Sequence, residues 1–173
     1  MKILITGKPG IGKTTVIKKL TSYLKDKAVG FYTEEIRDKT GHRKGFVIKT
    51  LDGKEGILAL KGLTSRYKVG NYGVNIEEFE SIAIPVLEKA LKENKIILID
   101  EIGKMELFSS KFAQLIKQLF EDKSKTIIAT IPIKNVHPVI RWIKSLPDAQ
   151  IIEIDYTNRD YIPEKILESI NER

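Results

Sequence analysis

The chain has 173 residues, 42% of them hydrophobic and 31% charged, and it contains no cysteine. This length and composition predict one globular domain over residues 1–173, and they exclude a disordered protein, a disulfide-stabilised scaffold and any site built on a thiolate. The formal net charge is +7, with lysines along the whole chain, so we expect a basic solvated surface and leave a nucleic-acid partner open.

Two further features bear on where the protein is found. No uncharged run is long enough to span a membrane, and the apolar stretch within residues 1–7 is too short for a signal peptide. We therefore expect a cytoplasmic protein with no membrane partner. The many lysines and glutamates, with only three glutamines and no cysteine, are typical of a thermophilic protein.

The first predicted elements form the beginning of a β-α-β unit. Residues 2–6 are almost continuously apolar and end at a glycine, which predicts a strand buried on both faces. A loop rich in glycine and proline follows, and residues 13–26 then carry apolar side chains at helical spacing. Residues 28–34 are predicted to form the second strand.

A hairpin insertion is predicted next. Asp52 and Gly53 separate two β-rich segments, 44–50 and 54–60, and an Asp-Gly pair between such segments is a strong hairpin signal. The region from about 36 to 75 therefore interrupts the alternation of strands and helices. It is rich in glycine and in basic residues, and we expect it to be a mobile excursion.

The alternation then resumes to the end of the chain. The predicted elements are helix 76–93 with a second segment opening at Pro85, strand 95–100, helix 110–122, strand 126–131, helix 136–146, strand 150–154 and helix 162–172. Strands that alternate with helices in this way predict an α/β fold with a doubly wound, mostly parallel sheet. The β-hairpin insertion around 36–75 is the one departure from that order.

The loop after the first strand carries the most specific functional motif. It fits the pattern G-x-x-x-x-G-K-[ST] at every fixed position and lies between a buried strand and a helix, which is the context that a phosphate-binding loop requires. Its glycines let backbone N–H groups approach phosphate oxygens, while Lys13 is expected to reach the β- and γ-phosphates and the Thr14 hydroxyl to bind Mg²⁺. The predicted nucleotide-binding residues are Gly7, Lys8, Pro9, Gly10, Ile11, Gly12, Lys13, Thr14 and Thr15.

Two carboxylates follow the apolar segment 96–99. Asp100 is expected at the carboxyl end of that strand, where ligands bind in open α/β sheets, and there it would hold the Mg²⁺ of Thr14 through a water molecule. Glu101 can accept a proton from the water that attacks the γ-phosphate. Glu101 and Lys13 are therefore the predicted catalytic residues, and a carboxylate at position 101 indicates hydrolysis rather than transfer to another acceptor.

The transferred phosphoryl group needs a further cation to offset its developing charge. The sequence leaves the choice among several cations open. The candidates are Arg43, Arg66, Lys104, Arg141 and Arg159.

Residues 100–109, Asp-Glu-Ile-Gly-Lys-Met-Glu-Leu-Phe-Ser, resemble the signature of the thermophilic nucleoside-triphosphatase family, which also includes the human cancer-related nucleoside-triphosphatase. Four shorter segments agree with the same family, so the resemblance covers essentially the whole chain. They are residues 30–37, 41–46, 69–74 and 158–160. Asn71 stands where the family pattern has a lysine, and we assign its segment no catalytic role.

The resemblance implies a P-loop NTPase of the RecA-like type that hydrolyses several nucleoside triphosphates with little base preference. It implies the same phosphate, Mg²⁺ and catalytic residues as the motifs do, and it adds Asn158 and Arg159 as nucleotide-binding residues near the base. From the residues alone, Asn158 is equally an N-cap of the last helix and Arg159 an exposed side chain.

Three functions are compatible with these patterns. The first, which the patterns favour, is a Mg²⁺-dependent enzyme that hydrolyses ATP, GTP, CTP and UTP to the diphosphate and phosphate, since no Asn-Lys-x-Asp motif for guanine follows a strand. The second is a nucleotide, nucleoside or polynucleotide kinase, for which Glu101 is not expected. The third is a nucleotide-gated module that binds nucleic acid or protein. The oligomeric state is open, with a monomer favoured.

Overall fold

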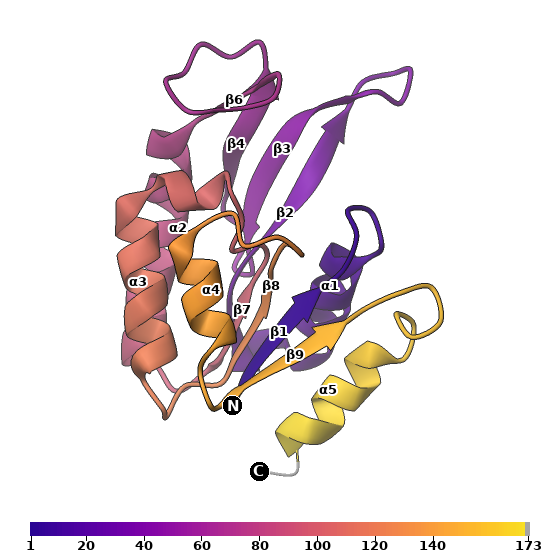
Figure 1. The fold of residues 1–173 in the computed structure, drawn as a ribbon, viewed down its shortest axis with the longest axis vertical. Coiled ribbons are helices and arrows are strands. Elements are labelled where there is room, and N and C mark those ends of the chain that lie inside the picture. Colours follow the sequence, from indigo (N-terminus) through magenta and orange to yellow (C-terminus); the bar gives the residue numbers. More distant parts are fainter. Residues whose placement is uncertain (172–173) are drawn as a thin grey trace.

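Residues 1–171 form a nine-stranded sheet in the order β5-β6-β4-β3-β2-β7-β8-β1-β9, covered by helices (Figure 1). The structure is a computed structural model that describes these residues, so residue 172 of the helix predicted over 162–172 lies outside the described range. The five strands from β2 to β9 in this order are parallel. Their bounds are Ala28–Arg37 for β2, Ile96–Ile99 for β7, Ile127–Thr130 for β8, Lys2–Thr6 for β1 and Ala149–Glu153 for β9.

Helices lie on both faces of the sheet (Figure 1). One face carries α1 (Lys13–Leu24) and α5 (Ile162–Asn171), and the other carries α2 (Ile76–Lys92), α3 (Ser110–Glu121) and α4 (Pro138–Lys144). In the described part of the chain, no helix is both long and apolar enough to cross a membrane.

Strand β1 shows why its sequence is apolar at every position. Leu4 packs in the core under α2, α3 and α4, whereas Ile3 and Ile5 pack in the core under α1 and α5. Successive side chains of a strand point to opposite faces, so a sheet covered on both sides requires apolar residues throughout. The predicted doubly wound α/β fold is confirmed.

An antiparallel extension, which we define as residues 36–75, continues the sheet beyond β2. Strand β2 runs past its predicted end to Arg37 and turns back into β3, and β4, β6 and β5 then follow in space. The bounds are Arg43–Thr50 for β3, Glu55–Lys61 for β4, Lys68–Val69 for β5 and Tyr72–Val74 for β6. The predicted hairpin is confirmed as β3 and β4, which are joined through Asp52 and Gly53.

The antiparallel extension is part of the main sheet and not a separate excursion. Ile48 and Leu58 are buried in the same core as Phe79 of α2. Gly56 lies against the same helix, because a Cβ at this position would stand 2.4 Å from a side-chain carbon of Ile82. The expectation that these residues form an excursion from the fold is therefore corrected, because α2 packs over the strands and buries one of their faces. The sequence of the strands alone does not show which helix covers them.

Helix α2 is continuous, whereas the sequence predicts a second segment that opens at Pro85. The proline is exposed, while Phe79, Ala83 and Leu87 bury one face of the helix on either side of it. This shared burial holds both halves in one helix despite the backbone N–H that proline lacks.

Phe79 provides a test of this core. It is fully buried and meets Phe31 and Phe112 edge-on, with ring centroids 5.9 and 5.2 Å apart. We expect Phe79→Ala to lower the free energy of unfolding by about 3–5 kcal/mol, because it leaves a cavity that the rings cannot refill. The exposed Tyr23→Ala should change it by less than about 0.5 kcal/mol. Urea unfolding measures the free energy of unfolding of both variants. A similar, small loss of stability in Phe79→Ala and Tyr23→Ala would contradict the assigned core.

Candidate active site

The phosphate loop connects β1 to α1 at the carboxyl edge of the parallel strands. Gly12 directly precedes α1 with a φ of +115°, a conformation that suits glycine, and no side chain caps the helix. A side chain is also excluded at Gly7, since a Cβ there would stand 2.9 Å from the carbonyl oxygen of Ile154. The first N–H groups of α1 are therefore open to an anion.

The other predicted residues of the loop differ in exposure. Lys8, Pro9, Gly10 and Thr15 are exposed, whereas the side chain of Ile11 is buried in the core under α1 and α5. Ile11 can therefore contact a nucleotide only through its backbone, and its side chain anchors the loop to the sheet.

Asp100 lies at the end of β7 and is almost completely buried, with 3% of its surface exposed. Its carboxylate accepts hydrogen bonds from the hydroxyls of Thr14 at 2.7 Å and Thr130 at 2.6 Å, and from the N–H of Thr33 at 3.4 Å. These partners belong to α1, β8 and β2, so the strand order itself assembles the site. Burial raises the pKa of Asp100 to about 6, against the opposing effect of the hydrogen bonds.

The pair of oxygen donors from Thr14 and Asp100 suits a hard divalent cation. A cation here would also offset the buried carboxylate, whose raised pKa shows that its charge is poorly compensated. Among the described residues, no group of three His, Cys, Asp or Glu side chains could hold a metal ion by itself. This fits a cation whose coordination is completed by phosphate oxygens and water.

Glu101 and Lys13 meet at the mouth of the phosphate loop. The Lys13 ammonium lies 3.2 Å from a carboxylate oxygen of Glu101 and 3.5 Å from the carbonyl oxygen of Ile131. Both side chains are partly exposed, at 13% for Lys13 and 28% for Glu101. The structure thus brings the two predicted catalytic residues together, with the carboxylate within reach of solvent.

A third carboxyl group, that of Glu106, belongs to the same cluster and has no role in the sequence analysis. It lies on the short 3-10 helix η2 (Glu106–Phe108) with 4% of its surface exposed. A Cβ placed on Gly103 would stand 2.8 Å from an oxygen of Glu101 and 3.0 Å from one of Glu106, so both carboxyls face the same point. Burial raises the pKa of Glu106 well above its usual range, and the charges of Glu101 and Asp100 raise it further.

The only sign of Glu106 in the sequence is its place within the family-like stretch 100–109. Its distance from Glu101 along the chain follows no helical or strand period. A turn after β7 folds back on the carboxyl end of that strand and brings the side chains of Glu101 and Glu106 together. The sequence does not predict this turn.

Arg159, which the family resemblance places near the base, lies against the phosphate loop. Its guanidinium donates to the carbonyl oxygen of Ile11 at 3.1 Å, and it lies over the ring of Tyr156 at 4.9 Å. Its Cδ is 3.6 Å from the position that a Cβ on Gly12 would take. Tyr156 is 77% exposed, so one face of this pair is open to a ligand.

Asn158 is engaged inside its own loop. Its side-chain oxygen accepts from the N–H of Asp155 at 2.8 Å, and its side-chain nitrogen donates to the carbonyl oxygen of Glu153 at 3.0 Å. These two bonds hold the amide inside the loop, and each end of the amide keeps one further hydrogen-bonding position. Asn158 fixes the loop that holds Arg159 in place.

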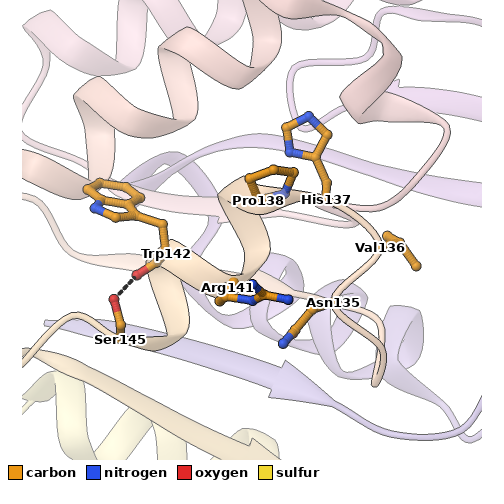
Figure 2. A pocket seen from close by; sticks show the side chains of 7 residues that line it. All are labelled: Asn135, Val136, His137, Pro138, Arg141, Trp142 and Ser145. Atoms are coloured by element: carbon orange, nitrogen blue, oxygen red, sulfur yellow. Dashed lines mark hydrogen bonds between the residues drawn. The ribbon is translucent and has the colours of Figure 1, made fainter.

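Two hollows flank this region, and only one touches the phosphate loop. A cavity of about 280 Å³ is lined by Gly10, Gly12, Thr15, Lys19 and Arg159 among others. A larger one of about 480 Å³ lies around the start of α4 and contains none of the predicted site residues except one candidate cation (Figure 2). The smaller cavity adjoins the N-terminus of α1 on the side of Arg159, and its lining does not include the carboxylate cluster around Asp100, so it borders the phosphate loop on the side away from that cluster.

Of the five candidate cations, Arg159 is the one that contacts the phosphate loop. Arg43 and Arg66 lie on the antiparallel extension, each against an aromatic ring. Arg141 projects from α4 on the side opposite Trp142 (Figure 2). Lys104 is exposed in the turn that follows Glu101.

Comparison with protein families agrees with this geometry. A family model described as NTPase matches residues 2–167. The chain belongs to the NTPase family. The resemblance seen in residues 100–109 is thereby confirmed.

Curated members of the NTPase family cover almost the whole chain. The chain is 51% identical to "Nucleoside-triphosphatase THEP1" of Aquifex aeolicus, over 96% of this chain and 97% of that protein. It is 37% identical to the human "Cancer-related nucleoside-triphosphatase", over 92% of this chain and 91% of that protein.

Two solved structures of the NTPase family have the same fold. The crystal structure of THEP1 from Aquifex aeolicus matches with a TM-score of 0.93 at 50% identity, and it covers 100% of both chains. The solution structure of a human cancer-related nucleoside triphosphatase matches with a TM-score of 0.83 at 35% identity, over 99% of this chain and 97% of that one. The P-loop NTPase fold expected from the sequence is confirmed.

The raised pKa of Asp100 predicts how the stability of the ligand-free protein depends on pH. The folded state binds a proton up to about pH 6, whereas the unfolded chain releases it near pH 3.8. This contribution to the free energy of unfolding is therefore fully present below about pH 4 and is lost as the pH rises through 6, by up to about 3 kcal/mol.

Urea unfolding of the metal- and nucleotide-free protein between pH 4 and 7 measures this loss. Asp100→Asn should reduce the dependence and leave the part that comes from Glu106, whose pKa is also raised by burial. Asp122→Asn should leave the dependence unchanged, because Asp122 is exposed to solvent and hydrogen bonds with Ser124 lower its pKa. A wild-type protein that gains stability over this range would contradict the assignment.

Proposed function

We propose that this chain is a Mg²⁺-dependent nucleoside-triphosphatase that hydrolyses ATP, GTP, CTP and UTP to the diphosphate and phosphate, with little preference for the base. The observation that carries the proposal is the contact between Lys13 and Glu101 at the mouth of the phosphate loop. Membership of the NTPase family supports it. The proposal includes the cytoplasmic location and the monomeric state expected from the sequence.

Binding of the triphosphate would begin at the N-terminus of α1. The backbone N–H groups of residues 7–15 offer donors to the phosphates, and the helix end adds a favourable positive potential. The Lys13 ammonium belongs to the first residue of α1, and it would exchange its contact with Glu101 for a contact with the phosphate oxygens. That exchange leaves the Glu101 carboxylate without its cation at the moment that substrate is bound.

Thr14 and Asp100 would hold the Mg²⁺ ion. The ion, when bound, offsets the negative charge of the phosphates and of the transferred phosphoryl group. Hydrogen bonds from Thr130 and Thr33 fix the Asp100 carboxylate, so the ligand oxygens are oriented before the ion arrives.

Glu101 would act as the general base. Its carboxylate is 28% exposed and can therefore reach a water molecule, and it can accept a proton as that water attacks the γ-phosphorus. Glu106, held close by and buried, would keep the Glu101 side chain at the mouth of the loop. Gly103 makes this approach possible, because any side chain there would stand between the two carboxyls.

The low base preference follows from the groups near Arg159. Tyr156 and the Arg159 guanidinium offer flat faces, which stack on any base. The amide of Asn158, which the family resemblance places near the base, already uses one hydrogen-bonding position at each end within its own loop. Recognition would therefore depend on the triphosphate.

Phosphate release without an acceptor tests the proposed reaction. Purified protein with Mg²⁺ and each of the four nucleoside triphosphates should release phosphate at rates within about tenfold of one another, because stacking discriminates weakly between bases. Chelation of Mg²⁺ should abolish release. A protein that releases no phosphate by itself, but forms the diphosphate and a phosphorylated product once an alcohol or phosphate acceptor is added, would be a kinase.

The role of Glu101 predicts a large loss of turnover in Glu101→Gln. The amide cannot take up the proton, so kcat should fall by about 10²–10⁴-fold. Glu121→Gln is the matched control, because Glu121 is exposed at the end of α3, and it should retain wild-type kcat. Equal kcat values for the wild type and Glu101→Gln would show that Glu101 is not the general base.

A further inference from the structure

The net positive charge of the chain is concentrated in the antiparallel extension. Residues 36–75 contain nine lysines and arginines against three acids, whereas the rest of the chain contains twenty-one against twenty. The basic surface expected from the sequence is therefore most strongly basic in this region. Lysines occur throughout the chain, but outside the extension acidic residues balance them.

Most of these cations gather at one end of the extension. The strand register places Arg37 opposite Arg43, Gly45 opposite Leu60 and Lys61 opposite Tyr72, so cations far apart in sequence lie in neighbouring strands. We call this group the basic rim. It consists of Arg37, Lys39, Arg43, Lys44, Lys61, Arg66 and Lys68.

The basic rim lies at the same edge of the sheet as the active site. Strand β2 runs parallel to β7, with Phe31 opposite Ile99, and its last residues therefore extend past the end of β7 that carries Asp100 and Glu101. Figure 1 shows this end of the extension at the top of the molecule, on the side toward which β1 and β7 also point.

Little negative charge compensates the basic rim. Glu35 pairs with Arg37 at 2.5 Å and with Arg43 at 3.4 Å, and Asp38 is the other carboxylate of the turn. The remaining five cations are exposed, and within the described range none of them forms an ion pair. They are Lys39, Lys44, Lys61, Arg66 and Lys68.

Three of the cations lie on aromatic rings. Arg43 lies over Phe46 at 5.3 Å and over Tyr72 at 5.4 Å, and its Nε donates to the Tyr72 hydroxyl at 2.8 Å. Lys61 lies over the same tyrosine at 5.8 Å, and Arg66 lies over Tyr67 at 5.7 Å. The rings hold the two guanidinium groups in place, and each group can offer its outer face to a ligand.

We propose that the basic rim binds single-stranded nucleic acid beside the active site. Its phosphates would lie on Lys44, Lys61 and Lys68, and its unpaired bases would stack on the guanidinium groups of Arg43 and Arg66. Neighbouring strands are about 4.8 Å apart, so the rim from β2 to β5 is about 19 Å long and suits a short stretch of single strand. An acidic protein would bind the positive charge of this surface but would offer no bases to stack on the guanidinium groups of Arg43 and Arg66.

The basic rim is connected to the catalytic turn through one ring contact. Tyr67 packs against Phe108 with ring centroids 5.2 Å apart, and Phe108 belongs to η2, the same helical turn as Glu106. The proposed single strand would therefore lie on the same side of the sheet ends as the phosphate loop, with the turn of Glu106 between them. The proposal does not depend on the hydrolytic reaction, since it rests on the charge and rings of the extension alone.

Fluorescence anisotropy with a labelled single-stranded 20-mer tests the proposal. Wild-type protein should bind, and its affinity should fall by roughly 50-fold between about 50 and 200 mM salt if four phosphates are contacted. The double variant Lys44→Glu, Lys61→Glu should lose at least tenfold in affinity while it keeps its nucleoside-triphosphatase rate.

The matched control is Lys27→Glu, Lys123→Glu, which makes the same charge change at the opposite ends of the strands. Lys27 precedes β2 and Lys123 precedes β8, and both lysines are exposed. This control should bind as the wild type does. Equal losses in the two double variants would overturn the proposal, as would the absence of binding at the lower salt concentration.

Arg66→Lys separates stacking from charge. This variant keeps the positive charge and loses the flat face, so its affinity for the 20-mer should fall several-fold with an unchanged salt dependence. Unchanged affinity would overturn the assignment to single strands. Wild-type binding to polyglutamate or to anionic lipid vesicles as tight as to the 20-mer would overturn it as well.

Discussion

Three carboxyl groups, those of Asp100, Glu101 and Glu106, gather at the carboxyl end of β7, and Lys13 is the cation that the described residues place against them. Two of the three are almost completely buried, so this charge is costly unless protons or cations compensate it. The parallel strands around β7 and the N-terminus of α1 meet at this point. In the proposed reaction a bound cation would offset this excess of negative charge, and the move of Lys13 from Glu101 to the phosphates would free the carboxylate to act as the base.

The proposed site would recognise the phosphates and leave the base largely unread. The backbone of the phosphate loop, Lys13 and the oxygen pair of Thr14 and Asp100 all address the triphosphate, whereas Arg159 and Tyr156 offer only flat faces. The antiparallel extension adds a second polar region at the same edge, and its charge has the opposite sign. Acidic and basic groups thus lie side by side along one edge of the sheet.

The sequence predicts those parts of the site that are encoded in short segments. The phosphate loop and the pair Asp100 and Glu101 are contiguous motifs next to apolar strands, and the fold follows from the same alternation. The position of Arg159 became an expectation only through the family resemblance, because nothing local shows that its loop returns to Ile11. Glu106 was missed for a similar reason. The basic rim depends on the four antiparallel pairings that join β2, β3, β4, β6 and β5, which no single segment of the sequence contains.

The central claim is that Glu101 opposes substrate binding through its contact with Lys13 and yet is required for turnover. The most direct test is the affinity of wild type and Glu101→Gln for a non-hydrolysable ATP analogue with Mg²⁺, measured by calorimetric titration. The account predicts that the variant binds several-fold more tightly, because Lys13 no longer has to leave a carboxylate and the phosphates no longer face one. Weaker binding in the variant would show that Glu101 supports the bound nucleotide directly, and it would contradict the account.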